Sequence, residues 1–368
     1  EIKSEKLLLD DKLLITIGGG RKDLMVHSGL TDSKYSDLHV MSTEMSKVWA
    51  ESDHLCIVWC LQLVLVVNRF LYSIIAPVKY KGNHSKGLSF IEDKAVRLAK
   101  AEQHFLGLEA RRVGEHKRKM ESPDVAEWYE DNRRIFTEKY KNGINRTRIQ
   151  MIRLFNNILH RAVRIDVINK ETDEWIFGCE ATETNGESRF CSNAVSLSNY
   201  TIKVPSELPD RIAVSLNLHD LKAKNPRWTH ILLRFKPTRE PFQFTVDIHN
   251  PADREMTVAM PKWYSFSTVN ILDDTLMGSS HYQFNITGLD ATHQAVELIV
   301  TPKFCSKHKT IAKICTPWAN GFNRFHQLDG DEKVTIWTPE SRPINYNTTQ
   351  NPIVVELMLD SECRYSIS

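Results

Sequence analysis

Long apolar segments are scarce in this sequence. The longest run, Leu55–Val67, is interrupted by Gln62 and is shorter than the roughly 20 residues that a helix needs to cross a bilayer. The chain begins with Glu1 and lacks the basic and apolar leader of a signal peptide. We therefore expect no membrane span within these residues, and the missing Met leads us to expect a piece of a longer protein.

An excess of charge of either sign is lacking too. Lys and Arg together number 48, and Asp and Glu number 46, which gives a net charge of +2. A general nucleic-acid-binding protein needs a strong basic excess, so we expect no nucleic-acid partner. With 41% hydrophobic residues, 15 Gly and 14 Pro in 368 residues, the composition excludes collagen and wholly disordered chains and fits two or three folded domains.

Cysteine is infrequent, but four of the seven cysteines fall into two close pairs. Cys179 with Cys191, and Cys305 with Cys315, each bracket a polar loop between strand-like segments. Strands joined by such loops can bring two cysteines within disulfide distance. We therefore expect both pairs to be disulfides.

A metal cluster is the alternative interpretation of Cys305, His308 and Cys315. It lacks a fourth ligand at a suitable spacing, so we expect neither a metal nor another cofactor. The cysteines inside the apolar run are expected to be buried free thiols, and one cysteine near the end of the sequence has no expected partner. These residues are Cys56, Cys60 and Cys363.

Five N-x-Ser/Thr sequons occur in the sequence, and each is a candidate glycosylation site. Together with the paired cysteines they favour a secretory or ER-lumenal setting. The candidate acceptors are Asn83, Asn145, Asn199, Asn285 and Asn347.

The apolar pattern divides the chain into three regions, and the expected fold class is α/β plus all-β. In residues 1–85 the apolar run Leu13–Ile17, closed by glycines, is typical of a buried parallel strand. Residues 86–145 combine balanced charges with apolar residues at three- and four-residue steps, which predicts a helical connector. Residues 146–368 contain short β-branched and aromatic segments between turn residues, which predicts a β-sandwich or jelly-roll domain.

One carboxylate and one histidine lie where an α/β-hydrolase needs them. Asp23 follows the first predicted strand, and His54 immediately precedes the apolar helix. In this fold the nucleophile, the acid and the histidine follow one another along the chain, and the acid fixes the imidazole tautomer that accepts the serine proton. A turn residue and a structural histidine are the plain alternatives. Asp32 and Asp53 are the fallback acids.

The nucleophile of such a triad is not found in this sequence. No G-x-S-x-G motif occurs; Ser188 and Ser280 come closest, but each lacks the second glycine and follows His54. We therefore expect residues 1–85 to be the C-terminal remnant of a hydrolase domain whose serine lies outside this chain. Cys60 is an alternative nucleophile, but no glycine elbow surrounds it.

Four short motifs carry a resemblance to a known family. They are Gly18-Gly19-Gly20-Arg21-Lys22-Asp23, Val26-His27-Ser28-Gly29-Leu30, Lys47-Val48-Trp49 and Asp53-His54-Leu55-Cys56-Ile57-Val58-Trp59-Cys60. In these motifs residues 14–75 resemble the end of the hydrolase domain of the GPI inositol-deacylases. The segment Trp175–Cys179 and the β-rich region after it are similar to the lumenal module of that family, whereas residues 86–145 match poorly.

The resemblance implies an esterase of the ER membrane, with this region lumenal. Such an enzyme removes the acyl chain from the inositol of GPI-anchored proteins, which are its expected partners. His54 would be the general base and Asp23 its orienting acid, and the membrane would be reached through segments missing from this chain.

A non-catalytic lumenal module that binds GPI-anchored or glycosylated cargo is the alternative function. Aromatic residues of the β-rich region could stack on sugars, or they could fill a sandwich core. The residues concerned are Trp228, Trp263, Tyr264, Trp318 and Trp337.

Overall fold

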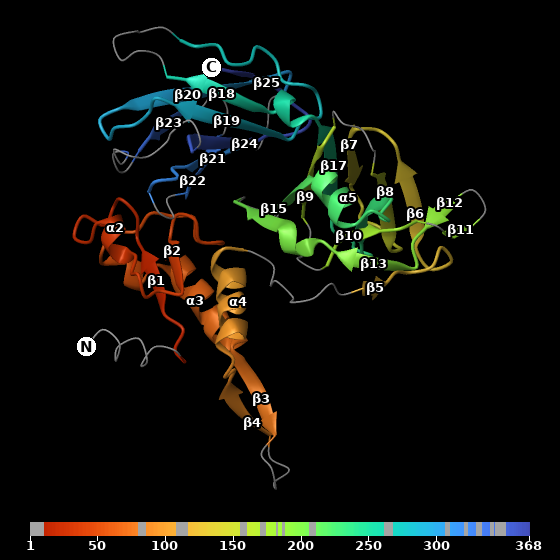
Figure 1. The fold of residues 1–368 in the computed structure, drawn as a ribbon, viewed down its shortest axis with the longest axis horizontal. Helices are drawn as coiled ribbons and strands as arrows, with labels where there is room; N and C mark the ends of the chain where they lie inside the picture. Colours follow the sequence, from red (N-terminus) through yellow and green to blue (C-terminus); the bar gives the residue numbers. More distant parts are fainter. Residues whose placement is uncertain are drawn as a thin grey trace.

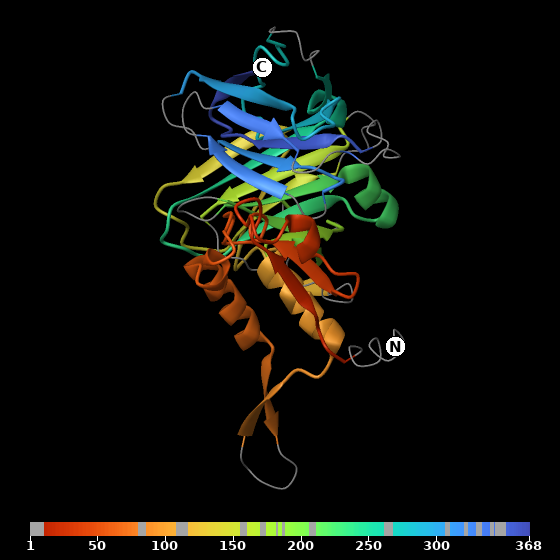
Figure 2. The ribbon, with the colours of Figure 1, turned by 90° about the vertical axis from the view of Figure 1, so that its left-hand side faces the viewer.

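The fold consists of an α/β part followed by two β-sandwiches, as Figure 1 and Figure 2 show. Each sandwich has its own hydrophobic core. The computed structural model describes residues 11–79, 86–107, 117–154, 160–169, 174–181, 183–185, 188–205, 211–260, 268–305, 310–319, 323–328, 333–338, 342 and 351–368.

The α/β part combines a short parallel sheet with helices. The first two strands pair in parallel, from Ile15 opposite Leu38 to Gly18 opposite Met41. A parallel pair needs a crossover connection, and the segment between the strands provides it. The elements are β1 (Ile15–Gly18), α2 (Ser28–Thr31), β2 (Leu38–Met41), η1 (Cys56–Val58), α3 (Leu61–Ser73), β3 (Ile75–Lys79), β4 (Lys86–Phe90) and α4 (Lys94–Phe105).

Helices α3 and α4 pack against each other through aromatic residues. α3 buries Leu63, Val66 and Phe70, which recur on one helical face. The ring of Phe70 lies 5.1 Å, centroid to centroid, from that of Phe105 in α4. Asp93 caps α4 by accepting hydrogen bonds from two backbone N–H groups. The β3–β4 hairpin extends away from the rest of the molecule (Figure 2).

The first sandwich packs a six-stranded sheet on a five-stranded sheet. In β9 the residues Val163, Ile165 and Val167 belong to the core between them, and the alternating Arg164 and Asp166 point to the opposite face. In order across the first sheet the strands are β5 (Lys117–Lys119), β13 (Asn193–Ser196), β10 (Ile176–Cys179), β16 (His230–Phe235), β8 (Arg148–Arg153) and β6 (Glu127–Asp131). The second sheet contains β14 (Thr201–Val204), β15 (Arg211–Asn217), β9 (Ala162–Ile168), β17 (Phe242–His249) and β7 (Ile135–Tyr140).

Smaller elements decorate this sandwich. They are the hairpin β11 (Glu183–Asn185) with β12 (Ser188–Phe190), the helix α5 (Leu218–Lys224) and the short turn η2 (Ser198–Tyr200). The turn η3 (Pro251–Asp253) connects β17 of this sandwich to β18 of the second one. α5 buries Leu218 and Leu221 against the core of the sandwich.

The second sandwich packs a five-stranded sheet on a three-stranded sheet. Its core contains Phe284, Val355 and Leu357 from the larger sheet and Val300 and Ile336 from the smaller one. The larger sheet contains β18 (Glu255–Ala259), β19 (His281–Thr287), β24 (Ile353–Met358), β21 (Thr310–Cys315) and β22 (Asn323–Leu328). The smaller sheet contains β23 (Lys333–Trp337), β20 (Ala295–Lys303) and β25 (Arg364–Ile367).

The expected helical connector at residues 86–145 is wrong for most of its length. Among the described residues of this region only those of α4 are helical, and residues 117–140 contribute β5, β6 and β7 to the first sandwich. All three are terminal strands of their sheets. Charged side chains are favoured on edge strands, where one edge of the strand faces solvent. The many charged residues of β5, β6 and β7 therefore obscured the alternation of apolar and polar residues by which a strand is predicted from sequence.

The expected β-sandwich fold of residues 146–368 is confirmed, but the region forms parts of two sandwiches rather than one. Strands up to β17 complete the first sandwich, and β18 to β25 form the second. Strand spacing along the sequence predicts strands, but it does not say how many cores they share.

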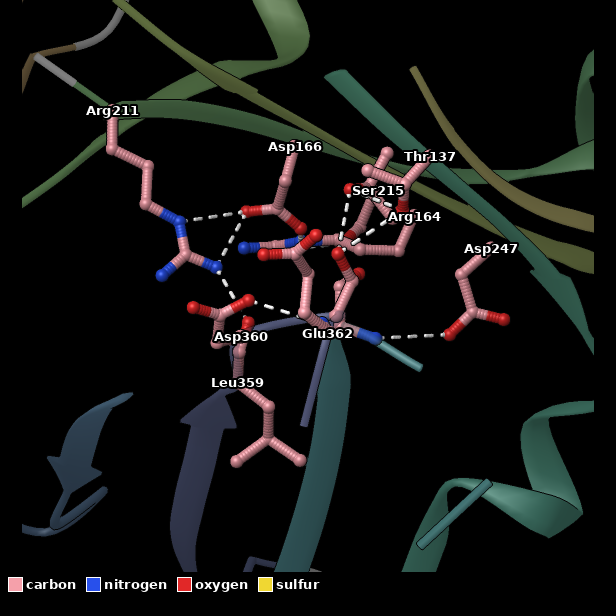
Figure 3. Close-up of polar contacts among 12 residues, drawn as sticks. Thr137, Arg164, Asp166, Arg211, Ser215, Asp247, Leu359, Asp360 and Glu362 are labelled. Atoms are coloured by element: carbon pink, nitrogen blue, oxygen red, sulfur yellow. Dashed lines mark hydrogen bonds and ion pairs between the residues drawn. The ribbon is translucent and has the colours of Figure 1, made fainter. Parts of the chain in front are cut away.

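The two sandwiches meet across buried charged and hydroxyl side chains (Figure 3). Asp166 accepts hydrogen bonds from Arg211 Nε at 3.2 Å and from its Nη2 at 3.1 Å. Arg211 Nη2 also donates to the Leu359 carbonyl of the second sandwich at 3.1 Å. Burial alone would raise the pKa of Asp166, but the guanidinium groups of Arg164 and Arg211 outweigh it, so the pKa is lowered. The interface therefore contains a carboxylate that stays charged.

Candidate active site

The loops after β1 and β2 carry the candidate active site. Gly19 lies in the first loop, and its carbonyl accepts a hydrogen bond from Ser52 N of the second loop at 2.7 Å. A Cβ at Gly19 would lie 2.6 Å from the Ser52 carbonyl oxygen, so only glycine allows this approach. The contact fixes the loop that leads to Asp23 beside the loop that leads to His54.

Asp23 and His54 form a hydrogen-bonded pair. His54 Nδ1 lies 3.1 Å from Asp23 Oδ2. The other carboxylate oxygen accepts hydrogen bonds from Val26 N at 2.9 Å and Met25 N at 3.1 Å. The backbone N–H of Val26 and the imidazole of His54 lower the pKa of Asp23 against the opposing effect of burial. An ionised carboxylate thus orients the imidazole.

The opposite side of the imidazole is accessible. The His54 side chain is 42% exposed, whereas that of Asp23 is 5% exposed. Within the described ranges no residue forms a hydrogen bond with His54 Nε2. This nitrogen can therefore accept a proton from a group brought to the site.

The fallback acids have other roles. Asp53 accepts hydrogen bonds from Leu55 N and Cys56 N at 2.9 Å and 2.7 Å, so its carboxylate stabilises the turn that leads into η1. Asp32 accepts a hydrogen bond from the Ser36 hydroxyl at 3.2 Å. The alternative nucleophile Cys60 is buried in the α/β core. Among these carboxylates, only Asp23 has a hydrogen bond to His54.

The second sandwich reaches the loop of Asp23 through a cation–aromatic stack. The guanidinium carbon of Arg21 lies 3.6 Å from the centroid of the Trp337 ring, and that of Arg324 lies 3.8 Å from the same centroid. Two guanidinium groups cannot share one ring face at these distances, so the ring lies between them. No pattern in the sequence indicates this contact, because the three residues come from distant segments.

Several large apolar side chains next to the dyad in sequence are exposed. Leu24 is 93% exposed and Leu55 is 70% exposed. Exposed apolar residues gathered in one region indicate a binding surface more often than scattered ones do. The others are Met25, Val58, Trp59 and Leu61.

The structure changes one of the expected disulfides. Cys179 and Cys191 are disulfide-bonded. The expected pairing of Cys305 with Cys315 is wrong, because Cys305 is bonded to Cys363 and Cys315 is a free thiol. β20 and β25 pair side by side, and this brings together the chain ends that follow β20 and precede β25. Cys56 and Cys60 are free.

The sequons differ in accessibility. Asn145 and Asn199 are exposed in loops and turns. Asn285 lies inside β19, between β18 and β24, and its side-chain oxygen accepts a hydrogen bond from Gln283 at 3.0 Å. Asn83 and Asn347 lie outside the described residues.

The aromatic residues expected to stack on sugars lie in different environments. Trp318 packs against the core of the second sandwich, and Trp337 lies between two arginines. Trp263 and Tyr264 lie outside the described residues. Trp228 lines a cavity.

In the described part of the chain, no group of His, Cys, Asp and Glu side chains has the arrangement of a metal site. No helix in the same residues is long and apolar enough to cross a membrane.

Comparison with known proteins places the chain in a family. Residues 1–74 match the PGAP1-like alpha/beta domain, and residues 252–368 match the GPI inositol-deacylase beta-sandwich domain. The chain is 34% identical over 368 residues to the GPI inositol-deacylase of Drosophila melanogaster. The aligned region covers 98% of this chain and 37% of that protein. The chain belongs to the GPI inositol-deacylase family.

Other GPI inositol-deacylases are more distant. The protein from Xenopus laevis is 26% identical across 85% of this chain and 33% of its own length. The protein from Rattus norvegicus is 23% identical across 96% of this chain and 37% of its own length. The chain thus spans about a third of the curated GPI inositol-deacylases that it matches. Its fold class, α/β plus all-β, is confirmed by the two matched domains.

The two matched regions correspond to different parts of the structure. The first match covers the loops of Asp23 and His54. The second begins just before β18 and covers the second sandwich. The first sandwich lies between the two matches.

Proposed function

We propose that this chain is part of a GPI inositol-deacylase that hydrolyses the acyl ester on the inositol of GPI-anchored proteins. The observation that carries the proposal is the contact of His54 Nδ1 with the buried carboxylate of Asp23. The family supports a hydrolase of this kind. His54 is the general base and Asp23 is its orienting acid.

The reaction follows from the geometry of this pair. A serine from a part of the protein beyond these residues approaches His54 Nε2 and gives it the hydroxyl proton as it attacks the ester carbonyl. The inositol oxygen leaves with that proton, and an acyl-enzyme remains. A water molecule then gives a proton to Nε2 as it attacks the acyl carbonyl, and the serine oxygen leaves with that proton as the fatty acid is released. The Asp23 carboxylate holds Nδ1–H and stabilises the imidazolium in both steps.

The surroundings of the dyad suit a lipid substrate. The exposed Leu24, Met25, Leu55 and Val58 lie next to the two residues in sequence, and an acyl chain gains free energy by covering such side chains. We place the region in the ER lumen, with the membrane reached through other segments of the protein. Since no G-x-S-x-G occurs in the chain, these residues alone are expected to be inactive.

The test uses the full-length protein that contains these residues. His54→Ala should lower the rate of inositol deacylation by at least about 10³-fold, because the general base is lost. Asp23→Asn should lower it by about 10²–10⁴-fold, because the amide favours the wrong tautomer. Mass spectrometry of the lipid released from a GPI-anchored reporter measures the acyl chain directly.

His27→Ala is the matched control. His27 is an exposed histidine in the same loop region, where it caps α2, and its replacement should leave deacylation unchanged. Full activity of His54→Ala, with His27→Ala also active, would overturn the assignment of the general base.

A further inference from the structure

A cavity of about 580 Å³ opens at one edge of the first sandwich, apart from the candidate active site. It lies between β10, β13 and the turn that follows α5. Ligand sites of small molecules have volumes of about 300–1,000 Å³. The walls are held in place: Cys179 is bonded to Cys191, and its carbonyl accepts a hydrogen bond from Thr229 N at 2.9 Å. The cavity is therefore preformed.

The indole ring of Trp228 forms one wall. A Cβ at Gly178 would lie 2.1 Å from this ring, so the indole rests directly on the backbone of β10. One part of the ring packs against the core of the sandwich, and another part lines the cavity. The negative face of an aromatic ring attracts the C–H groups on the apolar face of a pyranose. A fixed indole with an accessible surface is thus a platform for a sugar.

The charged residues in the remaining walls are predominantly basic. Lys117, Lys224 and Arg227 line the cavity, and Glu180 is the one acidic residue in the lining. The three cationic side chains are exposed, and in the described part of the molecule none of them has an ion-pair partner. Arg and Lys side chains bind phosphate oxygens through charge-assisted hydrogen bonds.

We propose that this cavity binds a phosphorylated sugar at the end of a glycan. The pyranose stacks on Trp228, and the phosphate lies among Lys117, Lys224 and Arg227. Ser192 and Asn193, also in the lining, supply polar groups for the sugar hydroxyls. The exposed rim leaves room for the glycosidic link to the rest of the glycan. The site goes beyond the catalytic proposal and does not depend on it, because it uses no residue of the dyad.

Isothermal titration of the whole chain, residues 1–368, tests the site with four ligands. Methyl glucoside 6-phosphate carries both chemical features and a glycosidic link. Methyl glucoside lacks the phosphate, inorganic phosphate lacks the sugar, and glucose 6-phosphate lacks the link. Methyl glucoside 6-phosphate should bind at least about ten-fold more tightly than methyl glucoside or inorganic phosphate, because only it uses the indole and the cations together.

Two double variants locate the binding. Lys224→Ala with Arg227→Ala should weaken binding of methyl glucoside 6-phosphate at least about five-fold. Lys141→Ala with Arg239→Ala removes the same charge from exposed positions outside the cavity and should change the affinity less than two-fold. Both pairs are on the surface, so the fold should tolerate their replacement. Trp228→Leu should also weaken binding, provided that its thermal unfolding matches that of the unchanged chain.

Three results would overturn the proposal. Equal losses in both double variants would show a general charge effect. Inorganic phosphate binding as tightly as methyl glucoside 6-phosphate would show that the indole contributes nothing. Binding of glucose 6-phosphate without binding of its methyl glycoside would exclude a glycan as the ligand.

Discussion

The guanidinium group of Arg21 stacks on the indole of Trp337, 3.6 Å from the ring centroid. Arg21 belongs to the loop that carries Asp23, and Trp337 ends β23 of the second sandwich. Arg324 of β22 contacts the same ring, and its Nη2 donates to the Trp337 carbonyl at 2.9 Å. Burial lowers the pKa of Arg324 to about 10, and Arg21 acts in the same direction. The second sandwich therefore supports the loop that presents the orienting acid.

Trp337→Ala in the full-length protein should lower kcat for inositol deacylation about ten-fold. The loop of Asp23 loses its support, and small displacements of catalytic groups are costly. Trp337→Phe keeps an aromatic face for both arginines and should retain most of the activity. The measurement is kcat and KM for both variants beside thermal unfolding. If Trp337→Ala kept its full kcat, the stack would not position the dyad.

Asp166→Asn should destabilise the chain by about 3–5 kcal/mol, since it removes the buried negative charge that the guanidinium groups of Arg164 and Arg211 both contact. Asp131→Asn is the control, because its partner Arg133 is 60% exposed, and it should cost at most about 1 kcal/mol. Urea unfolding compares the two. Equal losses would contradict a special cost at the interface of the sandwiches.

The disulfide of Cys305 with Cys363 predicts unequal effects of two serine substitutions. Cys363→Ser opens a link between residues 58 positions apart in the sequence, and such a loss costs about 2–5 kcal/mol. Cys315→Ser replaces a free thiol and should cost less. Thermal unfolding measures both variants, and mass spectrometry of non-reduced peptides identifies the link. A peptide that joins Cys305 to Cys315 would contradict this pairing.

His281 should make stability depend on pH. His281 lies in β19 directly opposite Met358 of β24. Met358 packs against residues of the first sandwich. Burial, then the positive charge of Arg164, lower the pKa of His281 from 6.5 to about 3, while Glu356 and Asp166 oppose this shift and His249 adds to it. Below pH 6.5 the unfolded chain binds a proton that the folded chain refuses, so stability falls as the pH falls toward 3.

The contribution of His281 amounts to about 2 kcal/mol between about pH 7 and about pH 5. His281→Gln should remove this part of the pH dependence, because glutamine does not titrate. Urea unfolding at both pH values, for the unchanged chain and the variant, gives the difference. An unchanged pH dependence in the variant would show that another group is responsible.

The order of acid and histidine, and the glycines beside them, could be predicted from the sequence because they are local. A buried strand that ends in Gly18–Gly20 must enter a loop, and Asp23 is the first acid after it. His54 directly precedes the segment that forms η1 and α3. Chain order and apolar pattern thus identified the two residues that the structure brings within hydrogen-bond distance.

What lies far apart in the sequence was decided by the tertiary structure alone. Cys305 is closer in sequence to Cys315, but strand pairing between β20 and β25 brings it to Cys363. The charges of residues 117–140 suggested a solvated helix, but these residues form the edge strands β5, β6 and β7. Trp337 and Trp228 were both candidates for stacking on sugars. In the folded chain Trp337 is stacked between two arginines, whereas Trp228 lines a cavity. Composition and periodicity report which side chains a segment can bury; only the packed chain determines which distant segment they are buried against.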